Sequence, residues 1–325
     1  MTSKTLQPIT EPQTPATPPK QESRVVLGFL IALSAHFSLA LAQFFMKKVQ
    51  PKISSFQVQY IIFIQMAVYN YILCCRNNFP IYFTKPQINR LTILRGILGI
   101  IGSTGLLYSL NKLSLSEVIV ISNTSPVITN ILAIIFLKET LDLPLALNAI
   151  LSMAGVLFIA QPGFLFSSNQ VTVDRGSLAL GFLCASISAI CGGIAPLVLK
   201  TAGKYVKPIT LSYFFGFVVS ILAPIGMFSQ SAVPLNFKDF MMLLIGGITM
   251  TAGQVLWAKS ALYAEASRLS MALYSQTIFA YILEIVVDQI YPDEMKIIGT
   301  LFILSGFFVL LQKAVRQSKE KTVSK

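Results

Sequence analysis

Long apolar stretches dominate this sequence and restrict the chain to one broad class of fold. Ten stretches of about 20 residues carry few charged side chains, and they lie at about 25–45, 56–75, 91–111, 116–137, 144–162, 177–199, 209–229, 239–262, 267–288 and 295–312. A helix of about 20 residues crosses the hydrocarbon core of a bilayer. Because backbone polar groups must be hydrogen-bonded internally in lipid, such segments are helical. The sequence predicts an all-α integral membrane protein with ten transmembrane helices.

The composition excludes several other classes. Charged residues make up 12% of the chain, about half of what a soluble domain carries, and the mean hydropathy is +0.70. The net charge of +12 is spread over hairpins and tails instead of forming one basic stripe, so we expect no nucleic-acid partner. The four cysteines have neither disulfide-framework nor metal-binding spacing. We therefore expect contact with membrane lipid, no metal and no cofactor, and a homodimer is one state that the sequence allows.

The fourth stretch contains a polar interruption. Residues 118–137 are twenty residues without a charge, and Asn123, Thr124, Ser125 and Pro126 stand near their centre. Proline lacks a backbone N–H, so Pro126 leaves polar groups at mid-depth that protein, water or ligand must satisfy. We expect the helix to break here and a solute to be held near the break.

The two halves of the chain show a weak internal repeat. When residues 108–139 are shifted by 149, they fall on residues 257–288, and a hydrophilic hairpin, a span with a polar centre and a terminal carboxylate recur in order. Gly155 and Gly306 share a register in the last span of each half and would permit close helix crossing. Five spans per half is an odd number, so the sequence predicts two inverted five-helix repeats.

This repeat fixes the expected domain boundaries. We expect a disordered cytoplasmic tail at 1–24, the first repeat at 25–162, a linker at 163–176, the second repeat at 177–312 and a basic cytoplasmic tail at 313–325. Counting Lys and Arg on alternate sides gives eighteen on the side of the termini and seven on the other. The positive-inside rule then places both termini in the cytoplasm, although Lys47, Lys48 and Lys52 run against it. The count does not separate the plasma membrane from an endomembrane.

The architecture resembles a known family. At residues 123–139, NTSPVITNILAIIFLKE places a proline before an apolar run that ends in Lys-Glu. Together with the two halves and the glycine of the fifth span, this resembles the EamA-type branch of the drug/metabolite transporter superfamily, which is related to the solute carrier 35 group. The resemblance covers about residues 25–312 and implies a transporter. Family members often have Pro and Glu where this chain has Ser275 and Asp288, so the resemblance implies no particular substrate.

Polar side chains inside the spans are the candidate site residues, because polar groups in the membrane interior often mark a pathway. Each also has a structural reading as a hydrogen bond between helices. Asn123 and Asn130 lie two turns apart on one helix face, with Thr124 beside them. The other substrate-binding candidates are Tyr108, Gln254, Trp257, Tyr274 and Gln276. His36 and Glu284 are the candidates for ion coupling, with an interhelical hydrogen bond and a hydrated helix end as their alternatives.

Enzymatic motifs are absent from the sequence. It contains no HExxH, no Walker sequence and no nucleophile elbow, and the single histidine limits triads and metal sites. We therefore expect a secondary transporter of a small organic solute that works by alternating access and is not an enzyme. A non-transporting membrane scaffold or regulator with the same fold, and an integral membrane transferase, are the alternatives. The solute, the coupling ion and the oligomeric state are not given by the sequence.

Overall fold

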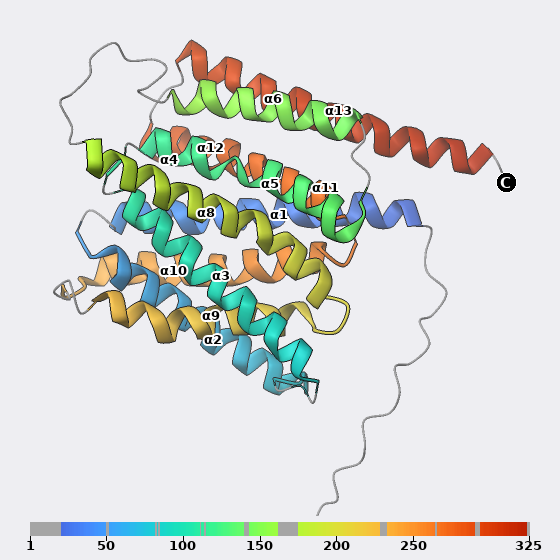
Figure 1. Ribbon diagram of the computed structural model, residues 1–325. Helices are drawn as coiled ribbons and strands as arrows, with labels where there is room; N and C mark the ends of the chain where they lie inside the picture. The colour runs from blue at the N-terminus through green and yellow to red at the C-terminus, as the bar shows by residue number, and fades with distance from the viewer. Residues whose placement is uncertain are drawn as a thin grey trace, which may run out of the picture.

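In the computed structural model, every described element is helical (Figure 1). The structure describes residues 21–49, 52–81, 83, 85–110, 112–113, 115–139, 143–161, 175–227, 233–263, 265–289 and 293–323. The first half contains α1 (Gln21–Val49), α2 (Ser55–Arg76), α3 (Pro86–Leu110), α4 (Leu115–Ser122), α5 (Ser125–Leu132), the π-helix η1 (Ala133–Leu137) and α6 (Leu143–Ala160). The second half contains α8 (Arg175–Ala202), α9 (Pro208–Met227), α10 (Phe237–Ser260), α11 (Ala266–Met271), α12 (Leu273–Asp288) and α13 (Glu294–Val323).

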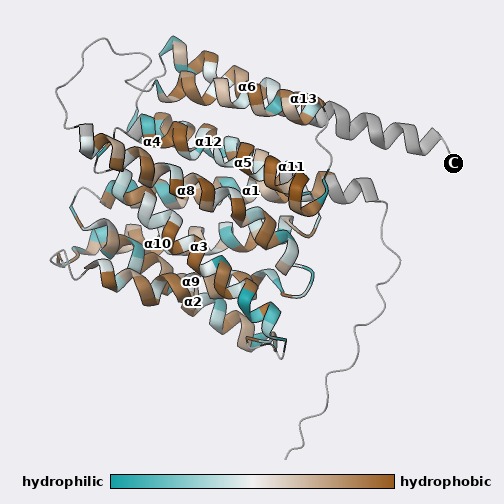
Figure 2. Ribbon diagram, viewed as in Figure 1, coloured by the Kyte–Doolittle hydropathy of each residue, from teal (hydrophilic) through white to brown (hydrophobic). Residues whose placement is uncertain are grey.

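The helices are long and apolar enough to make this an integral, multi-pass membrane protein (Figure 2). Among the described residues, nine candidate spans meet that criterion of length and composition. They are Val26–Val49, Phe56–Arg76, Pro86–Ser109, Glu117–Leu137, Leu143–Ala160, Gly176–Ala202, Pro208–Met227, Phe237–Ser260 and Leu269–Asp288. The last predicted span, at 295–312, lies within α13, which packs along α6.

The helices are stacked in layers (Figure 1). α6 and α13 form one edge, α4–α5 lies beside α11–α12, and α2 and α9 form the opposite edge. Between these layers, α1 packs on α10 and α12, whereas α8 packs on α3 and α5. The first helix of each half therefore contacts the third and fourth spans of the other half.

Both fourth spans are interrupted. α4 ends at Ser122 and α5 begins at Ser125, with Pro126 in its first turn, so the break lies where the sequence predicts it. In the second half α11 ends at Met271 and α12 begins at Leu273. The intervening Ala272 lies 149 residues after Asn123, so the second break falls at the position that the internal repeat gives, although no proline is present there.

The contact between α6 and α13 depends on glycine. A Cβ added to Gly155 would lie 2.4 Å from the carbonyl oxygen of Gly299, and one added to Gly299 would lie 2.5 Å from that of Gly155. A Cβ at Gly306 would lie 3.0 Å from Asn148 Nδ2. Small residues therefore let these two backbones approach closely, as the sequence predicts.

The tails differ in part from the predicted boundaries. α1 begins at Gln21, inside the segment predicted as a tail, and residues 1–20 lie outside the described residues. The predicted linker also lies outside them, except for residues 175 and 176 at the start of α8. At the other end, α13 continues as a helix to Val323, past the predicted end of the last span at 312.

Candidate functional site

An arginine lies in the apolar interior of the bundle. Arg95 is nine residues from the start of α3, about 13 Å along its axis, and only 3% of its surface is exposed. Its Nη2 donates to Gln254 Oε1 at 3.0 Å. Its guanidinium carbon lies over the Phe215 ring, 4.0 Å from the ring centre, and 5.5 Å from the centre of the Trp257 ring. Arg95 is one of the eighteen residues counted above on the side of the termini, and the structure instead places it inside the bundle.

A chain of amide and imidazole groups links α1 to α12. His36 Nδ1 lies 3.0 Å from Gln276 Oε1, and Gln276 Nε2 donates to Gln43 Oε1 at 2.7 Å. Because an amide oxygen only accepts, the imidazole donates through Nδ1, which leaves Nε2 as the acceptor nitrogen. That Nε2 is buried and has no hydrogen-bond partner in the part of the chain that the structure describes.

The histidine and the arginine belong to one region. The His36 and Trp257 ring centroids are 6.2 Å apart, and Trp257 is the aromatic neighbour of Arg95. We define the central polar cluster as His36, Gln43, Arg95, Gln254, Trp257 and Gln276. It joins α1 and α3 of the first half to α10 and α12 of the second. Four predicted site residues, His36, Gln254, Trp257 and Gln276, are brought together in it.

The predicted residues at the break of the fourth span bond mainly within their own helix. Asn123 Nδ2 donates to the Ile119 carbonyl at 2.8 Å, and the Thr124 hydroxyl donates to the Ile121 carbonyl at 2.6 Å. Asn130 is buried, and its Oδ1 has no partner among the described residues. These contacts give no direct link from the break to the central polar cluster.

The two predicted tyrosines lie elsewhere. Tyr274 is fully buried in an apolar cluster with residues of α6 and α13, such as Leu145 and Ile303. Tyr108 is 42% exposed near the far end of α3, thirteen residues from Arg95. The structure therefore does not bring either phenol into the central polar cluster.

Ion pairs join the helices at one end of the bundle. Lys47 Nζ lies 2.6 Å from Glu284 Oε1, Lys48 pairs with Asp288, and Lys52 Nζ lies 3.0 and 3.2 Å from the two oxygens of Asp239. They connect α1 and the residues after it to α12 and α10. Each of these three lysines, which run against the expected charge pattern, therefore has a carboxylate partner. Glu284, a predicted coupling residue, is a member of these pairs.

At the opposite end, a carboxylate joins the two interrupted spans. Glu139 Oε1 accepts a hydrogen bond of 2.9 Å from the backbone N–H of Ala266, which begins α11. Both ends of the bundle are thus tied across the interface between the halves, by side-chain ion pairs at one end and by a carboxylate at a helix start at the other.

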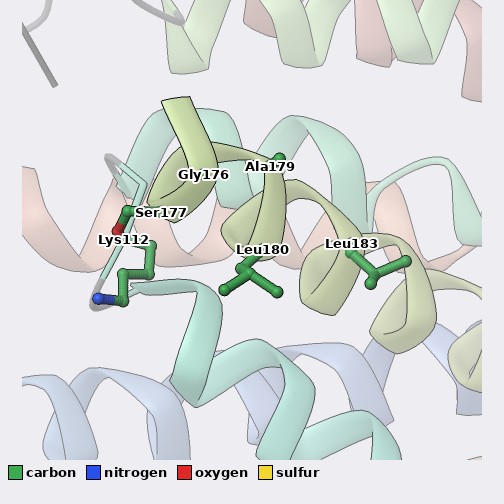
Figure 3. A pocket seen from close by; sticks show the side chains of 6 residues that line it. All are labelled: Lys112, Gly176, Ser177, Ala179, Leu180 and Leu183. Carbon is green, nitrogen blue, oxygen red and sulfur yellow. The ribbon is translucent and has the colours of Figure 1, made fainter. Parts of the chain in front are cut away.

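An open pocket is lined by residues that follow α3 and begin α8 (Figure 3). Lys112, Gly176, Ser177, Ala179, Leu180 and Leu183 line it, at the end of α3 and the start of α8. None of them is a predicted site residue. Within the described residues, no group of three or more His, Cys, Asp or Glu side chains is placed to bind a metal ion.

Sequence reasoning missed Arg95 and Gln43 as site residues. The signal for Arg95 was available, since LTILRGILGI places a single arginine in an apolar run, and an intramembrane charge marks a functional site by default. Gln43 carries no comparable signal, because its role depends on the position of Gln276 on a distant helix.

Comparison with known proteins places this architecture in a family. The model of the EamA-like transporter family matches residues 26–161 and again residues 179–312. The chain belongs to the EamA-like transporter family. A matched segment covers most of each half, so this EamA-like chain contains the family's unit twice.

Relatives of this EamA-like protein include named transporters. Human solute carrier family 35 member G1 is 27% identical over 291 residues, which are 86% of this chain and 77% of that protein. The probable transport protein YPL264C of Saccharomyces cerevisiae is 27% identical over 247 residues, 71% of this chain and 69% of that protein. The match to the uncharacterized membrane protein YMR253C of the same yeast is 24% identical and spans 61% of that protein.

The fold is also found in a solved crystal structure. Its superposition has a TM-score of 0.75 with 14% sequence identity, and it covers 91% of this chain and 99% of that chain. At this identity the likeness concerns the fold alone. The family and the names of the relatives support a membrane transporter in general, rather than an enzyme.

Proposed function

We propose that this EamA-like protein is a secondary transporter of a small organic solute, working by alternating access between two inverted five-helix repeats. The observation that carries the proposal is the central polar cluster, in which the Arg95–Gln254 pair and the hydrogen-bonded chain of His36, Gln276 and Gln43 are both neighbours of Trp257, where helices of both halves pack. Polar groups in an apolar interior are costly unless they serve a pathway or bond each other. Here His36 Nε2 and Trp257 Nε1 are buried without a partner among the described residues, which favours a solute as the partner.

Three observations support the inverted repeats and the ten spans. α1 packs on α10 and α12 as α8 packs on α3 and α5, which is the reciprocal pattern of a pseudo-two-fold axis. The breaks at Asn123 and Ala272 are related by the same shift of 149 residues. The family model matches once in each half. If the repeats are inverted, residues 91–139 and 240–288 superpose after a rotation of about 180° about an axis in the membrane plane.

The ion pairs support a specific state of the transport cycle. Lys47, Lys48 and Lys52 join α1 and the residues after it to α12 and α10 at one end, which supports a state closed at that end. Opening requires these pairs to separate. In this proposal Glu284 helps to keep this end closed through its pair with Lys47. His36, inside the central polar cluster, is the candidate for ion coupling.

The corrected charge count supports one orientation of the chain in the membrane. With Arg95 removed from the loops, seventeen Lys and Arg residues remain on the side of the termini, against seven on the other. We therefore propose that both termini are cytoplasmic and that the ion-paired end faces away from the cytoplasm. Cysteines introduced as Ser3→Cys and Ser324→Cys are expected to resist an impermeant thiol reagent in sealed cells. Labelling of either cysteine would contradict the proposed orientation.

Uptake into proteoliposomes tests the carrier. The purified full chain is reconstituted, and counterflow is measured with labelled sugars, nucleotide sugars, amino acids, organic acids and amines. We expect uptake of one chemical class that saturates with concentration. Gln276→Leu is expected to reduce it at least tenfold, because that amide bonds both His36 and Gln43.

A matched pair of variants separates a solute contact from a structural one. Asn123→Leu removes an amide that bonds only its own helix in the contacts above, so its melting temperature in detergent is expected to stay near that of the parent. If Asn123 also contacts solute, uptake falls at least tenfold at unchanged stability. Full uptake by a well-folded Asn123→Leu and Gln276→Leu double variant would remove both residues from the mechanism. A folded parent protein that transports nothing in the panel favours the scaffold alternative.

A further inference from the structure

Arg95 is a buried cation without a carboxylate partner. The ion pairs described above are made by Lys47, Lys48 and Lys52, and Arg95 has no salt-bridge partner among the described residues. Its contacts are a neutral amide oxygen and two aromatic rings. Removing a charge from water is expensive, and a neutral hydrogen bond with ring contacts compensates it only in part. The positive charge of Arg95 is therefore not balanced by a negative charge of the protein among the described residues.

The surroundings of Arg95 restrict how that charge can approach. The Phe215 ring lies against the guanidinium carbon at 4.0 Å and shields that side of the group. Gln254 takes one N–H of the five that a guanidinium offers. A guanidinium carries its N–H groups in one plane as a fork, and this fork matches the two oxygens of a carboxylate.

Two further groups are placed to complete a ligand site. Trp257 Nε1 can only donate, and it is buried without a partner in the described part of the chain. Its ring lies 5.5 Å from Arg95 and 6.2 Å from His36, whose Nε2 is the unpartnered acceptor. A bound carboxylate with a nearby hydroxyl would use all three: the guanidinium and indole donate to oxygen, and the imidazole accepts from the hydroxyl.

Charge limits the ligand further. Arg95 is the one formally charged side chain of the central polar cluster, whose other members are amides, an indole and an imidazole. A dicarboxylate or a phosphate monoester would bring a second negative charge without a partner. An amino acid would bring an ammonium, and the cluster offers it no carboxylate. Resting on the transport function proposed above, we propose that Arg95 binds the anionic group of the substrate and that this substrate is a small organic monocarboxylate.

The single tryptophan provides a binding assay that is independent of transport. Trp257 is the only tryptophan in the chain and lies beside Arg95, so its fluorescence reports ligands at this site. The purified full chain in detergent, at constant ionic strength, is titrated with lactate, hexanoate, succinate, glycerol 2-phosphate, alanine and glucose. We expect a saturable change in emission with lactate or hexanoate, and at least tenfold weaker binding of the other four compounds.

Variants at Arg95 test the role of the guanidinium. Arg95→Gln keeps a donor for Gln254 but removes the charge, and it is expected to weaken monocarboxylate binding at least tenfold. Arg95→Lys keeps the charge without the fork and is expected to weaken binding at least threefold. Arg90→Gln is the matched control, because Arg90 is exposed on the same helix, and its affinity should stay within twofold of the parent. If Arg95→Gln fails to fold, Arg95→Lys decides.

The outcomes separate this inference from the proposed transport. Parent-like affinity in a folded Arg95→Gln or Arg95→Lys variant overturns the assignment of Arg95. Tighter binding of glucose, alanine, succinate or the phosphate ester than of either monocarboxylate overturns the substrate class, even where proteoliposomes still transport a solute. Monocarboxylate binding that is lost in Arg95→Gln, without uptake by reconstituted protein, supports the anion site and contradicts the carrier.

Discussion

Breaking the three ion pairs should open one end of the protein. Lys47, Lys48 and Lys52 are about half exposed, at 53%, 38% and 56%, while Glu284, Asp288 and Asp239 are more buried, at 27%, 19% and 4%. Exposed pairs contribute about 0.2–1 kcal/mol each, so three pairs stabilise the closed end by about 2 kcal/mol. Since 1.4 kcal/mol corresponds to a tenfold change, the triple Lys→Gln variant should open this end about 30-fold more often.

Thiol labelling measures this opening. Ala40 is fully buried and lies two turns before Lys47 on the same face of α1, and Ala40→Cys is a small change. The reporter is placed in a chain whose four native cysteines are replaced, and an impermeant maleimide is added to sealed cells. Its labelling rate should rise about 30-fold in the triple variant, in proportion to the open population.

Controls separate the ion pairs from a general effect of charge. Lys238→Gln removes an exposed lysine next to Asp239 that takes part in none of the three ion pairs, so labelling should stay at the parent rate. High salt should raise labelling of the parent but not of the triple variant, because the Debye length falls from about 10 Å at 0.1 M to about 3 Å at 1 M. An unchanged rate in the triple variant, together with normal labelling of Lys238→Cys, would refute the role of the pairs in closing this end.

Two further predictions concern stability. Gly155→Leu places side-chain atoms where the Gly299 carbonyl oxygen lies, so it should destabilise the protein by about 1–3 kcal/mol, measured by melting in detergent. Gly192→Ala is the control, because a Cβ at Gly192 lies 3.4 Å from its nearest atom, and this variant should melt like the parent. Asp293 accepts from the Lys296 backbone N–H at 2.8 Å at the start of α13, and this bond lowers the pKa of Asp293. The stabilisation by the Asp293 carboxylate is fully present above the ordinary carboxyl pKa and is lost as the pH falls through the lowered pKa. Asp293→Ala should therefore destabilise the protein by about 1 kcal/mol at about pH 6. This difference from the parent should shrink as the pH is lowered towards about 3.

The break in the fourth span is a feature that the local sequence alone can predict. Pro126 removes a backbone donor from an otherwise apolar run, and this alone predicts that α4 and α5 are separate helices. The second break at Ala272 has no proline, and only the internal repeat points to it. In both cases the signal lies within one segment or in a comparison of two segments, so no knowledge of packing is needed.

Hydrogen bonds between side chains on different helices could not be predicted in this way. Asn123, with the strongest sequence signal, bonds its own helix, whereas His36 and Gln276, 240 residues apart, bond each other. Arg95 was counted with the loop charges because it lies only four residues after the expected start of its span at about residue 91, whereas α3 begins at Pro86 and carries Arg95 deeper into the bundle. A shift of a few residues in a helix start is enough to move a charge from solvent to the interior.

The sequence by itself determined the membrane class, the approximate spans, the break near Pro126 and the glycine crossing at Gly155, because lipid thickness and backbone hydrogen bonding act on each segment alone. Only the tertiary structure decided which polar side chains share a site. A helix presents its residues around a full turn, and the face that meets another helix is set by the packing of all the helices together. That packing gathers Arg95, Gln254 and Trp257, and it pairs Lys47 with Glu284 at one end of the bundle.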